Sequence, residues 1–90
     1  MKTIGLVCNL YNEANALPGW LETHAPFFDH IAVMHSGPQG AKSTDGTIEI
    51  LEKWRIPVTF GSIDAGYGVV RNATFRLSPC DWVMLLDADE

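Results

Sequence analysis

The chain has 90 residues, of which 47% are hydrophobic and 19% are charged, and a formal net charge of −5 at pH 7. This composition is typical of one small globular domain and excludes an intrinsically disordered chain. The acidic balance argues against a nucleic-acid partner, which usually requires a basic face, but it permits a small anionic ligand bridged by a metal ion.

Four short apolar runs predict the strands of a parallel sheet. The runs are mostly β-branched or large apolar residues, and a polar or glycine-containing segment follows each of them. They start about 26 residues apart, which leaves room for a crossover helix between successive parallel strands. The runs are Ile4–Cys8, Ile31–Met34, Ile56–Phe60 and Trp82–Leu86.

Helical signals fill the gaps between these runs. Pro18 suits the first turn of a helix, and Asp45 can cap the start of a second one. We expect a third helix from about Tyr67 to Leu77, because the Ser78-Pro79 pair disfavours its continuation. The 3.6-residue period predicts that the second helix buries one face, which is formed by Ile48, Leu51 and Trp54.

This alternation predicts an α/β fold, with a Rossmann-like parallel sheet and flanking helices. The common strand order is 3-2-1-4, and ligands then bind outside the carboxyl ends of the first and fourth strands. Asn9–Glu13 would therefore lie beside Asp87–Glu90. The same geometry puts Cys8 and Cys80 at opposite ends of the sheet, on the order of 15 Å apart and beyond disulfide reach.

The sequence carries no signal for export or membrane insertion. No apolar stretch approaches the roughly 20 residues that span a bilayer. No apolar region with a cleavage site follows Met1. The two cysteines are too few and too widely spaced for a disulfide framework or a zinc site. We therefore expect a cytoplasmic, reducing location.

Two closely spaced carboxylates directly follow the last apolar run. Asp87 and Asp89 are two residues apart, so they point the same way if the strand conformation persists. Two carboxylates ~6 Å apart repel by roughly 3 kcal/mol at an effective dielectric near 20, and a divalent cation would turn this cost into attraction. Mg²⁺ is often held by one or two carboxylates plus substrate phosphates. For the pair alone, the simpler interpretation is a solvated turn in which the acids merely end the strand.

Three further segments can contribute to an anion site. "AGYGVVRN" is a weak dinucleotide fingerprint, but as a glycine-flanked helix start it can meet a phosphate through backbone N–H groups and Arg71. "YNEA" puts the acceptor Glu13 where it could bind a base or a sugar. The simpler interpretations are a surface arginine, a solvated glutamate and, for "STDGT", an ordinary helix start. Their convergence at one side of the sheet favours a nucleoside diphosphate bound with a metal.

In order and spacing, six strings make the chain resemble the N-terminal half of a family 2 glycosyltransferase of the A-type fold, over nearly all of its length. They are "YNEA", "WLETH" with "FDHIAVMHSG", "STDGTIEILEKW", "GYGVVRNATF" and "WVMLLDADE". The resemblance implies that Asp89 ligates Mn²⁺ or Mg²⁺ on a nucleotide-diphosphate sugar of the UDP or GDP type. Asp87 would face the ribose or assist the metal, and Arg71 would lie near the diphosphate or base. The implied nucleotide-sugar-binding residues are Asn12, Glu13, His35, Asp45, Arg71 and Asp87.

The end of the second strand departs from the family pattern. Many relatives carry an acid there that holds the base, whereas this chain has His35-Ser36, and an extra stretch, Pro38–Lys42, follows. His35 could replace the acid as a hydrogen-bonding group, or the extra stretch could supply another contact. The identity of the base therefore stays open. We expect structural roles for His24 and His30.

The resemblance also bears on how much of a protein these residues represent. The family's acceptor-binding half and its catalytic base would follow the D-x-D element, so we expect residues 1–90 to be the donor-binding portion of a longer, inverting enzyme and to be inactive alone. Trp82–Leu86 would form an open apolar edge and could self-associate. The alternative is a nucleotide-binding remnant without turnover. A sugar nucleotidyltransferase is disfavoured, because no glycine-rich, basic phosphate loop follows the first strand.

Overall fold

Four parallel strands form one sheet in the order β3-β2-β1-β4 in the computed structural model, which describes residues 2–88. β1 (Ile4–Leu10) lies between β2 (His30–Gly37) and β4 (Trp82–Leu85), and β3 (Val58–Ser62) forms the edge opposite β4. Every pairing in the sheet is parallel. The α/β class and the strand order predicted from the sequence are therefore confirmed.

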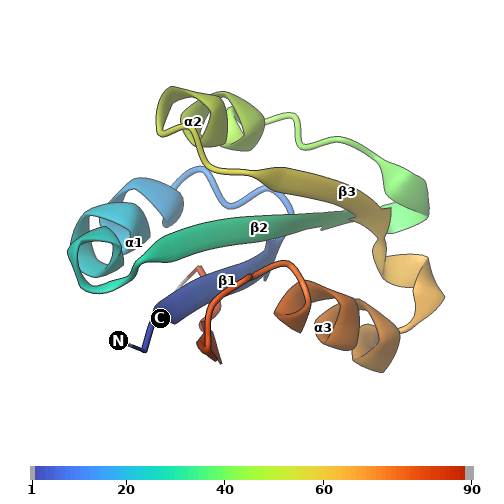
Figure 1. The fold of residues 1–90 in the computed structure, drawn as a ribbon. Helices are drawn as coiled ribbons and strands as arrows, with labels where there is room; N and C mark the ends of the chain where they lie inside the picture. The colour runs from blue at the N-terminus through green and yellow to red at the C-terminus, as the bar shows by residue number, and fades with distance from the viewer. Residues whose placement is uncertain (1, 89–90) are drawn as a thin grey trace.

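Helices and short turns connect the strands (Figure 1). α1 (Leu17–His24) and α2 (Thr47–Lys53) pack on one face of the sheet, and α3 (Tyr67–Phe75) packs on the other. No helix within residues 2–88 is long and apolar enough to cross a membrane. The 3₁₀ turns are η1 (Ala25–Phe27), η2 (Pro38–Gly40) and η3 (Ile63–Ala65).

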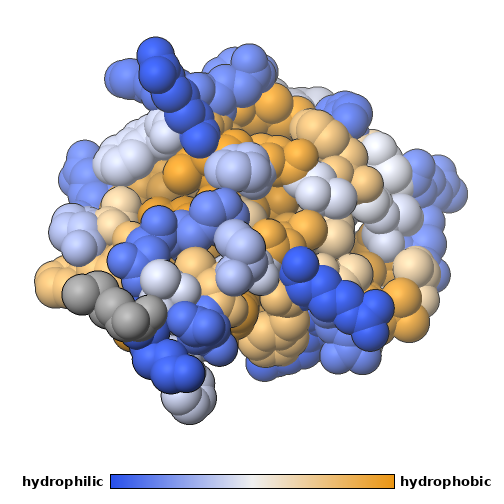
Figure 2. Space-filling model, in the orientation of Figure 1, coloured by the Kyte–Doolittle hydropathy of each residue, from blue (hydrophilic) through white to orange (hydrophobic). Residues whose placement is uncertain are grey.

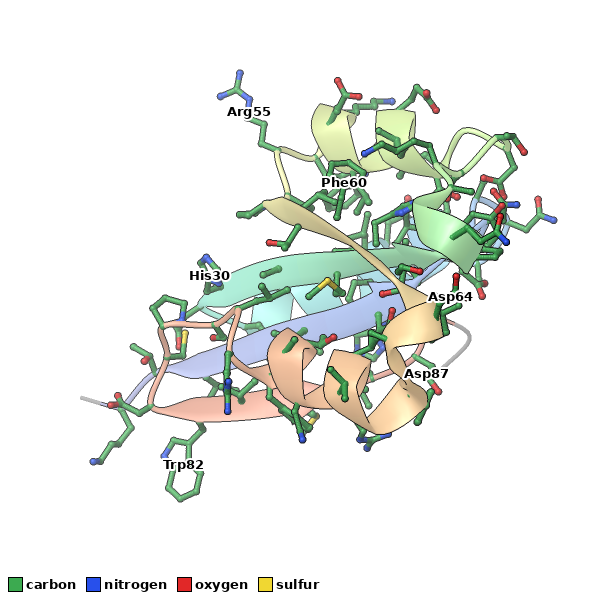
Figure 3. The ribbon with its side chains drawn as sticks, turned by 90° about the vertical axis from the view of Figure 1, so that its right-hand side faces the viewer. His30, Arg55, Phe60, Asp64, Trp82 and Asp87 are labelled. Atoms are coloured by element: carbon green, nitrogen blue, oxygen red, sulfur yellow. The ribbon has the colours of Figure 1, made fainter. Side chains whose placement is uncertain are left out.

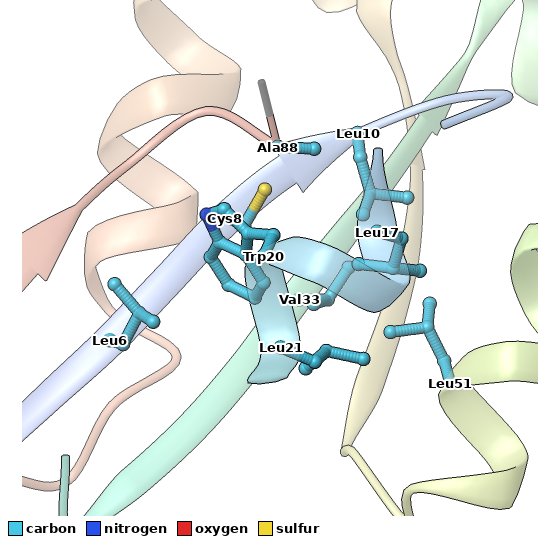
Figure 4. Close-up of a cluster of buried hydrophobic side chains, with 9 residues drawn as sticks. All are labelled: Leu6, Cys8, Leu10, Leu17, Trp20, Leu21, Val33, Leu51 and Ala88. Carbon is cyan, nitrogen blue, oxygen red and sulfur yellow. The ribbon is translucent and has the colours of Figure 1, made fainter. Parts of the chain in front are cut away.

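The central strand β1 is buried on both faces. Its alternate residues from Leu6 to Leu10 face α1 and α2, and Val7 faces α3, where Val70 and Thr74 are also buried. Burial of a leucine or valine side chain contributes about 1.5–3 kcal/mol relative to exposure, so this strand anchors the loop that follows it. Figure 4 shows the larger cluster, which consists of Leu6, Cys8, Leu10, Leu17, Trp20, Leu21, Val33, Leu51 and Ala88.

Some element boundaries differ from the sequence-based expectation. β2 continues past Met34 to Gly37: His35 pairs with both β1 and β3, and Ser36 and Gly37 pair with β3 alone. β3 begins at Val58 rather than Ile56, since Pro57 has no backbone N–H to donate to a ladder. α3 ends at Phe75, before the expected end at Leu77.

The edge strand β4 pairs only with β1 among the described residues. Trp82 is 63% exposed and Met84 is 49% exposed, and Figure 3 shows Trp82 extending away from the strand. The expected open edge is therefore present in this part of the chain, whereas self-association through it stays a prediction. Cys80 lies just before β4 and forms no disulfide with Cys8.

Figure 2 shows apolar surface near the middle of the face seen in Figure 1, with most hydrophilic side chains toward the outline.

Candidate functional site

The parallel strands bring four connecting segments to the same edge of the sheet. The loop after β1 begins at Tyr11, η2 follows β2, η3 follows β3, and Asp87 follows β4. Figure 3 shows Asp64 of η3 and Asp87 at this edge, whereas His30 and Trp82 lie toward the other end. This is the carboxyl edge at which open α/β sheets bind ligands.

Asn12 and Glu13 form the turn that leaves β1, and the backbone of this turn is bound to the segment before α2. Asn12 has a positive φ of 52°, which asparagine tolerates better than most residues. Its N–H donates to Ser43 Oγ at 2.9 Å, and its Oδ1 accepts the N–H of Thr44 at 2.9 Å. The N–H of Glu13 donates to Thr47 Oγ1 at 2.9 Å. Asn12 thus holds this turn in place, and its Oδ1 already has a partner.

The Glu13 carboxylate differs from the Asn12 amide. Glu13 is half-buried, and its carboxylate forms no hydrogen bond or ion pair with any residue between positions 2 and 88. An acceptor of this kind can bind a hydroxyl or an N–H group of a ligand without first breaking an internal bond.

His35 is the most deeply buried of the predicted site residues, with 1% of its surface exposed. Its Nε2 accepts the N–H of Ser43 at 3.0 Å and lies 2.7 Å from Ser43 Oγ. The ring packs edge-on against Tyr11, with centroids 5.8 Å apart, and is tilted against Phe60 at 5.3 Å. Because Nε2 is engaged by Ser43, this atom does not offer a hydrogen bond to a ligand.

Burial lowers the pKa of His35 below its ordinary value, and the positive charge of Lys42 lowers it further. A hydrogen bond to the backbone carbonyl of His35 itself acts in the opposite direction on this pKa. The neutral imidazole is therefore favoured, with Nε2 as the acceptor and the ring proton on Nδ1.

Asp45 joins the start of α2 to the loop after β1. Its Oδ1 accepts the backbone N–H of Thr47 at 3.1 Å as well as the Thr47 hydroxyl, and its Oδ2 accepts the N–H of Ala14 at 3.1 Å. The Thr47 hydroxyl is the main cause that lowers the pKa of Asp45; the N–H groups of Ala14 and Thr47 add to it and desolvation opposes it. Asp45 supports the helix start as expected, although Gly46, with φ 97°, occupies the N-cap position itself.

Arg71 and Asp87 are exposed and lie apart from this network. Arg71 donates to Tyr67 Oη at 3.4 Å, and its guanidinium carbon lies 5.9 Å from the centroid of the Phe75 ring. Asp87 follows β4. Within residues 2–88, neither side chain is bonded to Asn12, Glu13, His35 or Asp45.

The expected metal site lies partly outside the described residues. Asp89, its predicted principal ligand, and Glu90 fall beyond position 88. From 2 to 88, no three His, Cys, Asp or Glu side chains cluster closely enough to hold a metal ion. The Asp87 carboxylate has no partner in this range, so its oxygens suit a hard divalent cation.

The extra stretch Pro38–Lys42 and the following Ser43 form a strap (Pro38–Ser43) after β2, and the sequence did not predict its path. Gln39, with φ 53°, donates its N–H to Asp64 Oδ2 at 2.8 Å, and the Lys42 ammonium lies 3.2 Å from the centroid of the Phe60 ring. Gly37 is required at its base, because a Cβ there would lie 2.0 Å from the Ala41 carbonyl oxygen. The sequence gives no local signal for the contacts of Gln39 and Lys42, since each joins residues that are at least 18 positions apart.

The remaining histidines lie where the sequence placed them. His24 ends α1 and packs edge-on against Trp20, with centroids 5.7 Å apart, and His30 begins β2.

Neither the protein-family models nor the curated proteins compared with this chain give a match.

Proposed function

We propose that this chain is the donor-binding module of a glycosyltransferase and binds a nucleotide-diphosphate sugar together with Mn²⁺ or Mg²⁺. The observation that carries the proposal is the position of β1 beside β4 at the point where the strand order reverses. This arrangement sets the "YNEA" loop and Asp87 at the carboxyl ends of neighbouring strands, where α/β sheets bind nucleotides.

The charges on this side of the sheet support the proposal. Asp87 and Arg71 are exposed, and the carboxylates of Glu13 and Asp87 have no internal partner among residues 2–88. Asp87 would share the metal with Asp89, Arg71 would contact the diphosphate, and Glu13 would contact the nucleoside. A divalent metal bound there would neutralise the charge that develops on the departing diphosphate. The proposal requires donor binding, and turnover would need an acceptor site and a general base in addition.

The test is a calorimetric titration with Mn²⁺ and a nucleoside diphosphate, each alone and then together. We expect the metal to bind only in the presence of the nucleotide. Asp87→Asn should weaken the nucleotide–metal complex roughly 10- to 150-fold, the equivalent of losing one charge-assisted interaction of ~1.5–3 kcal/mol.

Asp81→Asn is the matched control, because Asp81 precedes the same strand at its opposite end and bonds to Thr3. This variant should bind the nucleotide–metal complex as the wild type does. Absence of binding by the folded wild type would refute the proposal. Equal affinities of the two variants for the nucleotide–metal complex would show that Asp87 does not contact it. Binding without transfer, in a protein that adds an acceptor site and a general base to this chain, would instead favour the nucleotide-binding remnant.

A further inference from the structure

The strap is held against the sheet at both of its ends. At one end, Gln39 donates its backbone N–H to Asp64 of η3. At the other end, Ser43 bonds to His35 of β2 through both its N–H and its hydroxyl. Between these points, Lys42 rests on Phe60 of β3. The light-green turn η2 therefore lies beside the end of β3 in Figure 1.

The contact between His35 and Ser43 depends on one lone pair. The N–H of Ser43 can only donate, so Nε2 must be unprotonated to accept it. Ser43 Oγ accepts the N–H of Asn12 at 2.9 Å and can therefore direct its own proton toward Nε2. A proton on Nε2 would face the Ser43 N–H, so this bond would be lost, and only Ser43 Oγ, which already accepts the N–H of Asn12, could receive the added proton.

The surroundings of the imidazole disfavour a second proton while the strap is closed. The titratable groups that face the ring are Tyr11, from the loop after β1, and Lys42, from the strap, while β3 presents the uncharged ring of Phe60. Burial of the ring and the Lys42 charge both lower the pKa of His35 from its ordinary value of 6.5. Opening the strap removes the contact with Ser43 and admits water.

We propose that His35 is a pH-sensitive latch, in which protonation of Nε2 releases Ser43 and opens the strap at the carboxyl end of β2 and β3. Proton linkage gives the direction in which pH shifts the strap between its closed and open forms. The open form binds a proton more readily than the closed form, so acidification below about pH 6.5 shifts the population toward the open form. Through Ser43, the same event frees the N–H of Asn12 in the loop after β1. The latch concerns the strap and does not depend on the proposed function.

The experiment is residue-resolved amide hydrogen exchange of the folded chain by NMR, between about pH 5 and pH 8, with each rate corrected for intrinsic exchange. Protection of the Ser43 amide should fall by up to tenfold per pH unit below about pH 6.5 and stay constant above it. The amide of Val33, which donates to the Pro57 carbonyl at 3.0 Å inside the sheet, should keep its protection. Ring ¹⁵N shifts should show Nε2 of His35 unprotonated at neutral pH and titrating together with the loss of Ser43 protection.

Two variants separate the latch from a general effect of acid. His35→Gln can accept the Ser43 N–H through its amide oxygen but cannot titrate, so its Ser43 protection should not change with pH. His24→Gln makes the same substitution at the end of α1 and should keep the wild-type slope. Three results would overturn the latch: a flat Ser43 profile in the wild type, joint loss of Ser43 and Val33 protection, or a wild-type slope in His35→Gln. Should His35→Gln fail to fold, the wild-type ring shifts decide, because a protonated Nε2 at neutral pH contradicts the proposal.

Discussion

The two sides of the carboxyl edge of the sheet use their polar groups differently. On the side of β2, four hydrogen bonds join the loop after β1 to residues 43–47. On the side of β4, Arg71 and Asp87 contribute none to this network. A polar group that is already paired gains little from a ligand, whereas an unpaired charge can contribute its full interaction. The β2 side therefore gives the site its shape and leaves only the Glu13 carboxylate without a partner among residues 2–88, whereas the β4 side keeps the charges of Arg71 and Asp87 exposed to a ligand.

The largest effect on stability should come from removing the hydrogen bonds of the Thr47 hydroxyl, which lie on the β2 side of the site. Its side chain is fully buried, and its hydroxyl accepts the N–H of Glu13 and donates to Asp45. Thr47→Val keeps the shape and removes both bonds, so the free energy of unfolding should fall by about 1–3 kcal/mol. Urea denaturation measures this loss.

Ser36→Ala is the matched control for that loss. Ser36 is 5% exposed, and its hydroxyl is buried without a partner among the described residues. Removing a hydroxyl that makes no bond should leave the free energy of unfolding unchanged or raise it by up to about 1 kcal/mol. A loss as large as that of Thr47→Val would mean that burial, rather than hydrogen bonding, sets the cost.

Asp45 should make the free energy of unfolding sensitive to acid. Its pKa is lowered in the folded protein, chiefly by the Thr47 hydroxyl, from an ordinary value of 3.8. The unfolded chain thus takes up the proton first, so the stabilisation by Asp45 is complete above that value and is lost as the pH falls through the folded pKa. Urea unfolding at a series of pH values should show a shallower acid slope in Asp45→Asn. Glu52→Gln, on the exposed side of α2, is the control and should keep the wild-type slope.

The smallest effect on stability is expected for Arg71 on the other side. The side chain is exposed and its bond to Tyr67 is long, at 3.4 Å. Arg71→Ala should change the free energy of unfolding by no more than about 0.5 kcal/mol. The same variant should bind a nucleoside diphosphate more weakly than the wild type while its affinity for the nucleoside stays the same. A loss of stability comparable to that of Thr47→Val would show that the two sides do not differ as described.

Most of the hydrogen bonds between the loop after β1 and residues 43–47 could not be predicted from the sequence, because they join segments that are far apart in the chain. An aspartate before an apolar helical face predicts a cap, and Asp45 does bond to Thr47. Its second bond, to Ala14, joins residues 31 positions apart and has no local pattern. His35 was one of two alternatives for contacting a base, and its Nε2 is engaged by Ser43. Only the register of β2 and the path of the strap decide that partner.

The sequence by itself determined the number and order of the strands and α-helices, because runs such as Ile4–Cys8 must be buried and the intervening segments suit helices. Tertiary structure decided where those elements end. β2 reaches Gly37 through polar and small residues, because β3 supplies pairing partners for Ser36 and Gly37 after the ladder with β1 has ended at His35. Tertiary structure also decided which polar residues are paired internally and which stay open to a ligand. Hydrophobic burial follows from residue type and period, whereas pairing depends on which groups come within about 3 Å once the chain has folded.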